Sequence, residues 1–289
     1  TRLQGDWSSD VCSSDLGVEV LTDAHVQSTR KVLGIPGKVA GHTGQAFWQT
    51  GVTSVAVGVG DLTKSQEGVS FDRKSGLATN CCGDFHSVGT LDAPDATEPI
   101  RHEGLFFKFP FDVQRTSYPF WDGELDRAEP IAYKGQDKID GVTVYRFQQK
   151  LGPEKTGSQT GLPGTLFGTD HPVDADLVYE NTRTLWVEPN TGVIIKGVEQ
   201  QNRRFEAAGL SAVPITVGTI GYSDKTVKDN ADTWGTKATL LKALRTSVPI
   251  GGIVLGIVLI GLGALLLFRR RRDGETPPMR SREQVPAGA

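Results

Sequence analysis

The sequence has little positive charge and few sulfur-containing residues. Among 289 residues, 31 Lys and Arg stand against 34 Asp and Glu, with only 3 Cys and 1 Met. Nucleic-acid binding requires a basic face, so this slightly acidic balance argues against a nucleic-acid partner. The chain also has no CxxC or HxxxH spacing, no nucleophile motif and no phosphate-binding glycine loop. We therefore expect no metal, no cofactor and no enzymatic activity.

Long apolar runs are absent except for one, Val248–Phe268, which is 21 residues without a charged side chain. A helix of that length spans roughly 30 Å, the thickness of the hydrocarbon layer of a bilayer. A buried core helix would normally show a polar stripe, and it would leave the arginines that follow unexplained. The sequence predicts a transmembrane helix whose anchor is defined by Val248, Phe268, Arg269, Arg270, Arg271 and Arg272.

The arginine cluster also predicts the orientation of the chain in the membrane. Basic flanks of membrane helices stay on the cytoplasmic side. We expect a cytoplasmic basic tail at 269–289 and the bulk of the chain on the extracytoplasmic side of the cell membrane. Before Val248 the chain carries 25 Lys and Arg against 31 Asp and Glu, a mildly acidic ectodomain.

Residues 1–16, TRLQGDWSSDVCSSDL, resemble translated sequencing-adapter read-through. We interpret this segment as non-native and leave Cys12 out of the cysteine count. The alternative is an ordinary polar N-terminal loop. If the segment is non-native, the true N-terminus is lost, and the absence of a signal peptide or a first membrane helix here carries no meaning.

Residues 17–222 show strand patterns separated by turn residues. Two stretches, Val69–Asn80 and Leu185–Lys196, share one scheme, in which an acidic residue ends a strand and a glycine follows where positive φ is needed. Val55, Val57 and Val59 alternate with a period of two, which is typical of a half-buried strand. We predict a mainly β extracytoplasmic domain, antiparallel, with a curved or barrel-like sheet.

Two stretches of this domain carry other signals. Leu151–Asp170 is rich in glycine and predicts a loop, whereas Asp174–Tyr179 is compatible with a short helical turn. Residues 223–247 then change to a helical period, which predicts an amphipathic helix weakened by Gly235. In the apolar run, Gly252 and Gly256 form one GxxxG, a weak indication of pairing with another helix.

Cys81 and Cys82 are the only cysteines left once Cys12 is excluded. An oxidising compartment allows a vicinal disulfide, which closes no long loop and adds little constraint to the unfolded chain. Two free thiols remain an equal alternative, and bonds to a partner chain are a third. A metal site built from these cysteines with Asp84 and His86 is disfavoured, because adjacent cysteines do not both reach one tetrahedral ion comfortably.

An aromatic belt between residues 106 and 121 is the most distinctive soluble stretch. As a strand it places Leu105, Phe107, Phe109 and Phe111 on one side. Burial in the sheet core is the first interpretation, and the wall of an apolar ligand cavity is the second. The candidate wall residues are Phe106, Phe107, Phe109, Phe111, Tyr118, Phe120 and Trp121.

Several motifs resemble one family in order and spacing. They are NCCGDF (Asn80–Phe85), HEGLFFKFPF (His102–Phe111), YPFWD (Tyr118–Asp122), GVTVYRFQQ (Gly141–Gln149) and TRTLWVEPNTGVIIKGVEQQ (Thr182–Gln201). Over roughly residues 20–270 the chain resembles the actinobacterial PorA-like family, formerly a domain of unknown function. The resemblance implies a membrane helix at each end, of which this chain shows the second. It also implies a cell-envelope protein, and one member has been described as a cell-wall channel.

A single apolar helix without a polar stripe cannot line a pore. The strands of the ectodomain look too short and too often interrupted by charge for a transmembrane barrel. We therefore expect a membrane-tethered envelope protein that binds or conducts an apolar or lipid ligand, or that scaffolds envelope partners. The alternatives are a channel formed by an oligomer and a purely structural protein; an enzyme ranks last.

Overall fold

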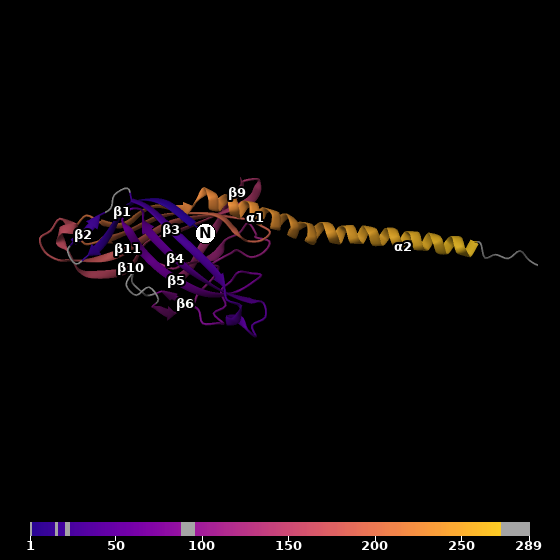
Figure 1. The fold of residues 1–289 in the computed structure, drawn as a ribbon, viewed down its shortest axis with the longest axis horizontal. Helices are drawn as coiled ribbons and strands as arrows, with labels where there is room; N and C mark the ends of the chain where they lie inside the picture. Colours follow the sequence, from indigo (N-terminus) through magenta and orange to yellow (C-terminus); the bar gives the residue numbers. More distant parts are fainter. Residues whose placement is uncertain (1, 15–16, 21–23, 88–95, 273–289) are drawn as a thin grey trace, which may run out of the picture. The chain divides into compact units, whose positions relative to one another are not determined.

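The computed structural model describes residues 2–14, 17–20, 24–87 and 96–272, and its dominant element is an antiparallel sheet (Figure 1). The strands are β1 (Arg2–Ser14), β2 (Gly17–Val20), β3 (Ala24–Gly34), β4 (Gln45–Ala56), β5 (Gly60–Asp72), β6 (Phe85–Ser87), β7 (Thr97–Pro99), β8 (Tyr118–Asp122), β9 (Arg127–Ile139), β10 (Val142–Leu162), β11 (Val173–Val187), β12 (Ile194–Glu206) and β13 (Val213–Tyr222). Short 3₁₀ turns occupy Pro36–Val39 and Gly164–Phe167.

The strand order is β7-β6-β5-β4-β3-β1-β13-β12-β11-β10-β9-β8, with β2 paired to β1. β1, formed by the adapter-like segment, lies between β13 and β3 and pairs with both through its backbone. The two ends of the order, β7 and β8, are not paired with each other in the described part of the chain, so the sheet is not closed into a barrel. The prediction of a mainly antiparallel β domain is confirmed.

The strands are longer than the sequence suggested. β10 has 21 residues and β11 has 15, so the expectation that the strands are too short for a barrel was wrong. The predicted loop at Leu151–Asp170 is largely strand, because three register shifts between β10 and β11 absorb its glycines and proline as bulges. The predicted helical turn at Asp174–Tyr179 is part of β11, where Val173 and Ala175 alternate inward.

The strand predicted around Val55 ends earlier than its valines. β4 stops at Ala56, and Val57 and Val59 are 56% and 61% exposed in the following turn. Gly58 in this turn has φ +84°, a conformation that breaks the alternation.

The two matching turns predicted from the sequence are confirmed in detail. Gly76 N donates to Asp72 O at 2.8 Å, and Gly192 N donates to Glu188 O at 2.9 Å. The two glycines have φ of +76° and +74°. Each acidic side chain accepts the backbone N–H three residues later at 2.7 Å, from Ser75 in one turn and from Thr191 in the other.

The aromatic belt runs between these turns and forms no strand from residue 105 to 117, so its predicted alternation was wrong. Phe109 N donates to Gly192 O at 2.8 Å, and Phe111 N donates to Lys74 O at 3.0 Å. The backbone is thus satisfied by turns from two distant parts of the sheet instead of by one neighbouring strand. Leu105 forms single bridges with Leu77 and with Phe120, which link this segment to β8.

Helix α1 (Asp224–Lys242) packs on the sheet through Ala231, which is buried against Val144 and Ile195. Gly235 faces β10 directly: a Cβ there would lie 2.6 Å from Val142 Cγ2. The glycine that weakens the helix locally is therefore what allows its close approach.

A second compact unit begins at Leu240. It contains a π turn at Ala243–Ser247 and helix α2 (Val248–Arg272). The helical stretch Asp224–Phe268 has an 18-residue window of mean hydropathy 2.7, and it is the one helix in the described residues long and apolar enough to cross a membrane. The part of the predicted cytoplasmic tail after Arg272 lies outside the described residues.

Candidate functional site

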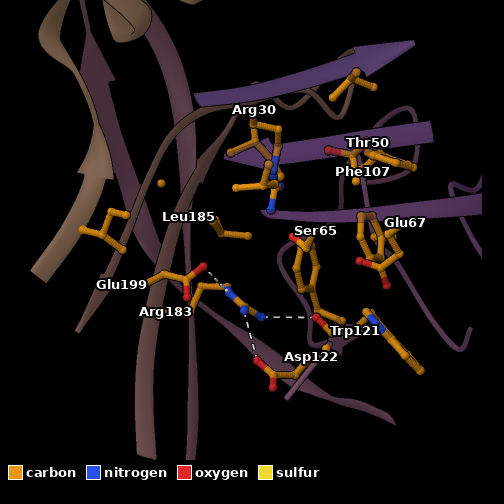
Figure 2. Close-up of a pocket in the computed structure, with 18 of the residues that line it drawn as sticks. Arg30, Thr50, Ser65, Glu67, Phe107, Trp121, Asp122, Arg183, Leu185 and Glu199 are labelled. Atoms are coloured by element: carbon orange, nitrogen blue, oxygen red, sulfur yellow. Dashed lines mark hydrogen bonds and ion pairs between the residues drawn. The ribbon is translucent and has the colours of Figure 1, made fainter. Parts of the chain in front are cut away.

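A cavity of about 600 Å³ lies against one face of the sheet (Figure 2). We call this the inner face; on β4 it carries Trp48, Thr50 and Val52. Its walls come from β3, β4, β5, β6, β8, β11, β12, β13, α1 and the aromatic belt. All of these residues belong to the compact unit that ends at Thr239. This volume lies in the range of pockets that take small molecules.

A largely buried arginine, Arg183, lines the cavity. Arg183 Nε lies 2.9 Å from Glu199 Oε1, and Nη2 lies 3.0 Å from Asp122 Oδ2. Nη1 donates to Gln149 Oε1 at 2.7 Å and to the Trp121 carbonyl at 3.2 Å. The β11–β12 register places Arg183 directly opposite Glu199. One cation is thus held between two carboxylates, as Figure 2 shows.

These carboxylates have further donors. Asn181 Nδ2 donates to Glu199 Oε2 at 2.8 Å, and the Tyr179 hydroxyl donates to Asp122 Oδ2 at 3.2 Å. Burial raises the pKa of Glu199, but the charge and hydrogen bonds of Arg183 lower it more, to about 2. Burial lowers the pKa of Arg183, yet Glu199 and Asp122 raise it well above its ordinary value. Glu199 and Arg183 therefore keep their charges at neutral pH. The cluster has two carboxylates and one arginine.

A buried histidine lies behind another wall of the cavity. His102 is 2% exposed, with Nδ1 at 3.1 Å from Asp84 Oδ2 and Nε2 at 2.9 Å from Glu67 Oε1. Asp84 is fixed in turn by the Ser70 amide at 3.0 Å and the Ser70 hydroxyl. Of the three ionisable groups in this chain of contacts, Glu67 is the one that lines the cavity.

Both ring nitrogens of His102 thus face carboxylates. Burial lowers the pKa of His102, but the hydrogen bonds to Asp84 and Glu67 and the charges of both acids raise it, and the net pKa lies above the ordinary 6.5. The imidazolium form can donate to both acids at once, which a neutral ring cannot do.

A row of side chains crosses the sheet beside Glu67. The registers pair Val32 with Thr50, Thr50 with Glu67, and Glu67 with His86. All four line the cavity. Directly opposed residues in antiparallel strands point to the same face, with Cβ atoms about 5 Å apart. The row therefore presents a hydroxyl next to a carboxylate.

Two residues that line the cavity each carry a buried polar atom without a hydrogen-bond partner among the described residues. These atoms are the Thr50 hydroxyl and the Trp121 indole N–H, from residues 2% and 3% exposed. Buried polar groups are nearly always paired, so an unpaired group on a cavity wall calls for a bound molecule or water.

The structure divides the predicted wall residues. Phe106, Phe107, Phe120 and Trp121 line the cavity. Phe109 is fully buried in the sheet core with Tyr118 packed against it, and Phe111 is 38% exposed beneath Lys108 Nζ at 4.1 Å from the ring centroid. The cavity wall also carries charged side chains, whereas the sequence predicted an apolar wall.

Cys81 and Cys82 form a disulfide in the structure. His42 comes within 4.8 Å of both sulfur atoms, but disulfide sulfurs are not thiolates, the form that binds zinc. Gly252 and Gly256 lie on α2, with nothing within 4 Å of a Cβ at either position.

Sequence reasoning missed Asp122, Arg183 and Glu199. One signal was present: the Glu188–Gly192 turn joins two strands, which brings Arg183 near residues 198 and 199. The register shift between Trp186 and Val187 decides which of the two faces the arginine. Such a one-residue bulge has no distinct sequence signature here.

The comparisons point to one family. A family model described as porin PorA matches residues 5–265. A porin PorA from Corynebacterium resistens is 24% identical over 279 residues, covering 71% of this chain and 66% of that protein. A porin PorA from Corynebacterium amycolatum is 29% identical over 133 residues, covering 37% of this chain and 33% of that protein. The chain thus spans less than two thirds of either relative.

Proposed function

This chain belongs to the porin PorA family, and on that premise we propose that it is a membrane-anchored cell-envelope protein, without enzymatic activity, whose sheet domain binds or conducts a small amphipathic envelope molecule. The cavity is the observation that carries this proposal. Its walls combine aromatic rings such as Phe107 and Trp121 with the Arg183 cluster. An amphipathic occupant places its apolar part on the rings and its polar end at the charged groups.

The anchor and its orientation are part of the proposal. The apolar helix α2 spans the cell membrane, and the arginines at its end stay in the cytoplasm. A protease added to intact cells, after removal of any outer barrier, should digest the sheet domain and spare a tag placed after Ala289. Loss of the tag with survival of the domain would show the opposite orientation.

The binding proposal is tested by what the protein carries. Purified full-length protein, extracted in mild detergent, should retain a lipid or other amphipathic molecule detectable by mass spectrometry. Val52 lines the cavity, and Thr53 next to it on β4 points to the opposite face of the sheet. Val52→Trp should narrow the cavity and reduce retention, whereas Thr53→Trp should preserve it. Equal retention in both variants would argue against the cavity as the site.

A channel formed by several copies is the second candidate, and the family description favours it. The outward positions of β4 include Gln49 and Thr53, which do not suit contact with lipid. We therefore place the solute path on the inner face and not between sheet and lipid. Full-length protein in planar bilayers should then show unitary conductance steps that Val52→Trp reduces and Thr53→Trp does not. No conductance from folded protein would leave binding as the function.

The charges along the cavity predict which ions such a path prefers. Glu67, Asp122 and Glu199 on its walls outnumber Arg30 and Arg183. The reversal potential in a salt gradient should indicate preference for cations. A preference for anions would place the path elsewhere.

A further inference from the structure

One part of the cavity collects hydrogen-bond acceptors without matching donors. Thr50 and Glu67 lie directly opposite each other on β4 and β5 and both line the cavity. The Thr50 hydroxyl has no partner in the described residues. Glu67 uses Oε1 for His102, and no hydrogen bond to Oε2 is found in the same part of the chain. Glu67 thus keeps one carboxylate oxygen for a bound donor, and the covered Thr50 hydroxyl next to it has no competing partner.

Aromatic rings line the cavity together with this pair of acceptors. The Phe106 and Trp121 rings contact the His102 imidazole, with centroids at 5.7 and 4.9 Å. The Phe107 ring lies 4.6 Å from that of Phe106 and 5.3 Å from that of Trp48, two residues before Thr50 on the same face of β4. His102 thus contacts both Glu67 and two of these rings, and Figure 2 labels Phe107, Trp121, Thr50 and Glu67 among the residues that line the one cavity.

We propose that the Glu67–Thr50 pair and the aromatic rings around it form a binding site for an organic ammonium group, either free or as the headgroup of a lipid. This proposal rests on the proposed function, because it names the chemistry of the molecule that the cavity takes. The ammonium N–H groups donate to Glu67 Oε2 and to Thr50 Oγ1. The ring faces stabilise the remaining positive charge through cation–π contact.

Other ligand chemistries fit this corner less well. An anion would meet the Glu67 carboxylate, and a purely apolar chain would leave the Thr50 hydroxyl and the Trp121 N–H buried and unpaired. A small inorganic cation gains from Glu67, but it would have to lose much of its water to reach the rings. An ammonium ion with a neighbouring oxygen also supplies the acceptor that the Trp121 N–H lacks.

Two positive groups lie near the site and set its limits. Arg30 faces the cavity one row further along, opposite Val52, which is about 7 Å along the strand from the Thr50 row. His102 lies behind Glu67 and shares its carboxylate. Arg30 can accompany an anionic part of the same ligand. His102 fixes Glu67 in place without reaching the cavity itself, so it is a positioning residue.

The test compares small probes on the full-length protein in detergent micelles. Saturation-transfer NMR and calorimetry measure binding of 2-aminoethanol, of the neutral 1,2-ethanediol and of the anion glycolate. Lysophosphatidylethanolamine and lysophosphatidylglycerol form the corresponding lipid pair, and comparing lysophosphatidylethanolamine with 2-aminoethanol distinguishes a lipid headgroup from a free amine. We expect both amines to bind and their neutral and anionic analogues to bind at least about tenfold more weakly, the factor for a difference of about 1.4 kcal/mol. KCl and MgCl₂, added at matched ionic strength, should compete only weakly with the amines for the site, and to the same extent.

Two variants assign the site to its acceptors. Glu67→Gln should weaken amine binding about tenfold or more, because it removes the charge at constant shape. Thr50→Val should weaken amine binding several-fold without lowering the thermal unfolding midpoint, since it removes a hydroxyl that has no partner. Glu103→Gln, an exposed acid near the same segment and not on the cavity wall, is the matched control and should bind as the original protein does.

The outcomes separate this proposal from the proposed function. If 1,2-ethanediol or lysophosphatidylglycerol binds as well as its amine counterpart, or if Glu67→Gln binds amines unchanged, the ammonium site is refuted while the cavity remains a binding site. If the protein retains an amphipathic molecule without an amine and binds neither amine probe, the same conclusion follows. If no probe binds and nothing is retained, both proposals fail. Loss of amine binding in Glu103→Gln would place the site outside the cavity.

Discussion

The imidazole Nε2 of His102 lies 2.9 Å from Oε1 of Glu67, a contact that joins the segment just before the aromatic belt to strand β5. Its strength depends on a proton. With Asp84 at the other ring nitrogen, only the imidazolium form bonds to both acids, and this raises the pKa of His102 against the effect of its burial. The wall of the cavity is therefore held by a group that titrates above its ordinary range.

Folding stability should consequently depend on pH through His102. Its folded-state pKa lies above the unfolded value of about 6.5, so its stabilising contribution is complete below pH 6.5 and is lost as the pH rises through the folded-state pKa. Chemical unfolding of the full chain over pH 5–9 should show this decline. His102→Gln should flatten the decline, whereas His42→Gln, at an exposed position, should leave it in place. An unchanged slope in His102→Gln would assign the pH dependence to other groups.

The Arg183 cluster should be sensitive to loss of its cation. Arg183→Gln leaves the buried carboxylate of Asp122 and the partly buried carboxylate of Glu199 without their cation and should lower the free energy of unfolding by about 3 kcal/mol. Arg146→Gln, which breaks the more exposed pair with Asp137, should cost less than about 1 kcal/mol. Urea unfolding at pH 7 measures both. Equal losses in the two variants would mean that the cluster contributes no more than a surface pair.

The same cluster predicts how stability responds to acid. The pKa of Glu199 is about 2 against an ordinary 4.5, so its contribution is present above pH 4.5 and is lost as the pH falls toward 2. Acid unfolding of Arg183→Gln should begin at higher pH than that of the original protein. Coincident acid transitions would contradict the lowered pKa.

Much of the fold could be predicted from local patterns, and the exceptions have physical reasons. The charge-free run Val248–Phe268 and the turns at Gly76 and Gly192 are visible because each depends on residues close in sequence. The aromatic belt alternates like a strand, yet its backbone bonds to turns at Lys74 and Gly192. Nothing in the sequence near Phe109 could show that its partners lie that far away.

The candidate site was less predictable than the fold. The rings of Phe106 and Trp121 could be chosen by composition, because aromatics mark both cores and cavities. Composition could not identify Glu67, Thr50 and Arg183 as site residues, since isolated polar residues in strands are usually solvated. Only the strand register shows that Thr50 faces Glu67, and register follows from the turns and bulges of the whole sheet.

The turn glycines provide a direct test of the close approach to the belt. A Cβ on Gly192 would lie 2.1 Å from the Phe109 carbonyl oxygen at φ +74°, whereas a Cβ on Gly209 at φ +76° meets nothing within 4 Å. Gly209→Ala should cost about 1 kcal/mol for the backbone conformation alone. Gly192→Ala should cost about 3 kcal/mol because overpacking is added. Equal midpoints in thermal unfolding would show that the belt moves aside freely.

Replacement of Gly235 by alanine should destabilise the protein, although alanine has the higher helix propensity. Alanine in mid-helix normally gains about 1 kcal/mol over glycine, but here its Cβ would lie 2.6 Å from Val142 Cγ2. Gly235→Ala should therefore destabilise the protein, by about 1 kcal/mol.

A double-mutant cycle with Val142→Ala isolates the contact. Removal of the valine methyl groups makes room for the new Cβ, so the double variant should be more stable than the two single losses predict. Additive losses would place the cause elsewhere in α1.

The two matching turns also govern the order in which the chain can assemble. Lys74 and Gly192 hold the aromatic belt at Phe111 and Phe109, although more than a hundred residues of chain separate the two turns. Closing so long a loop costs entropy before any contact repays it. The belt can dock only after both halves of the sheet have met. The cavity beside the belt should therefore be among the last parts of this protein to form in folding.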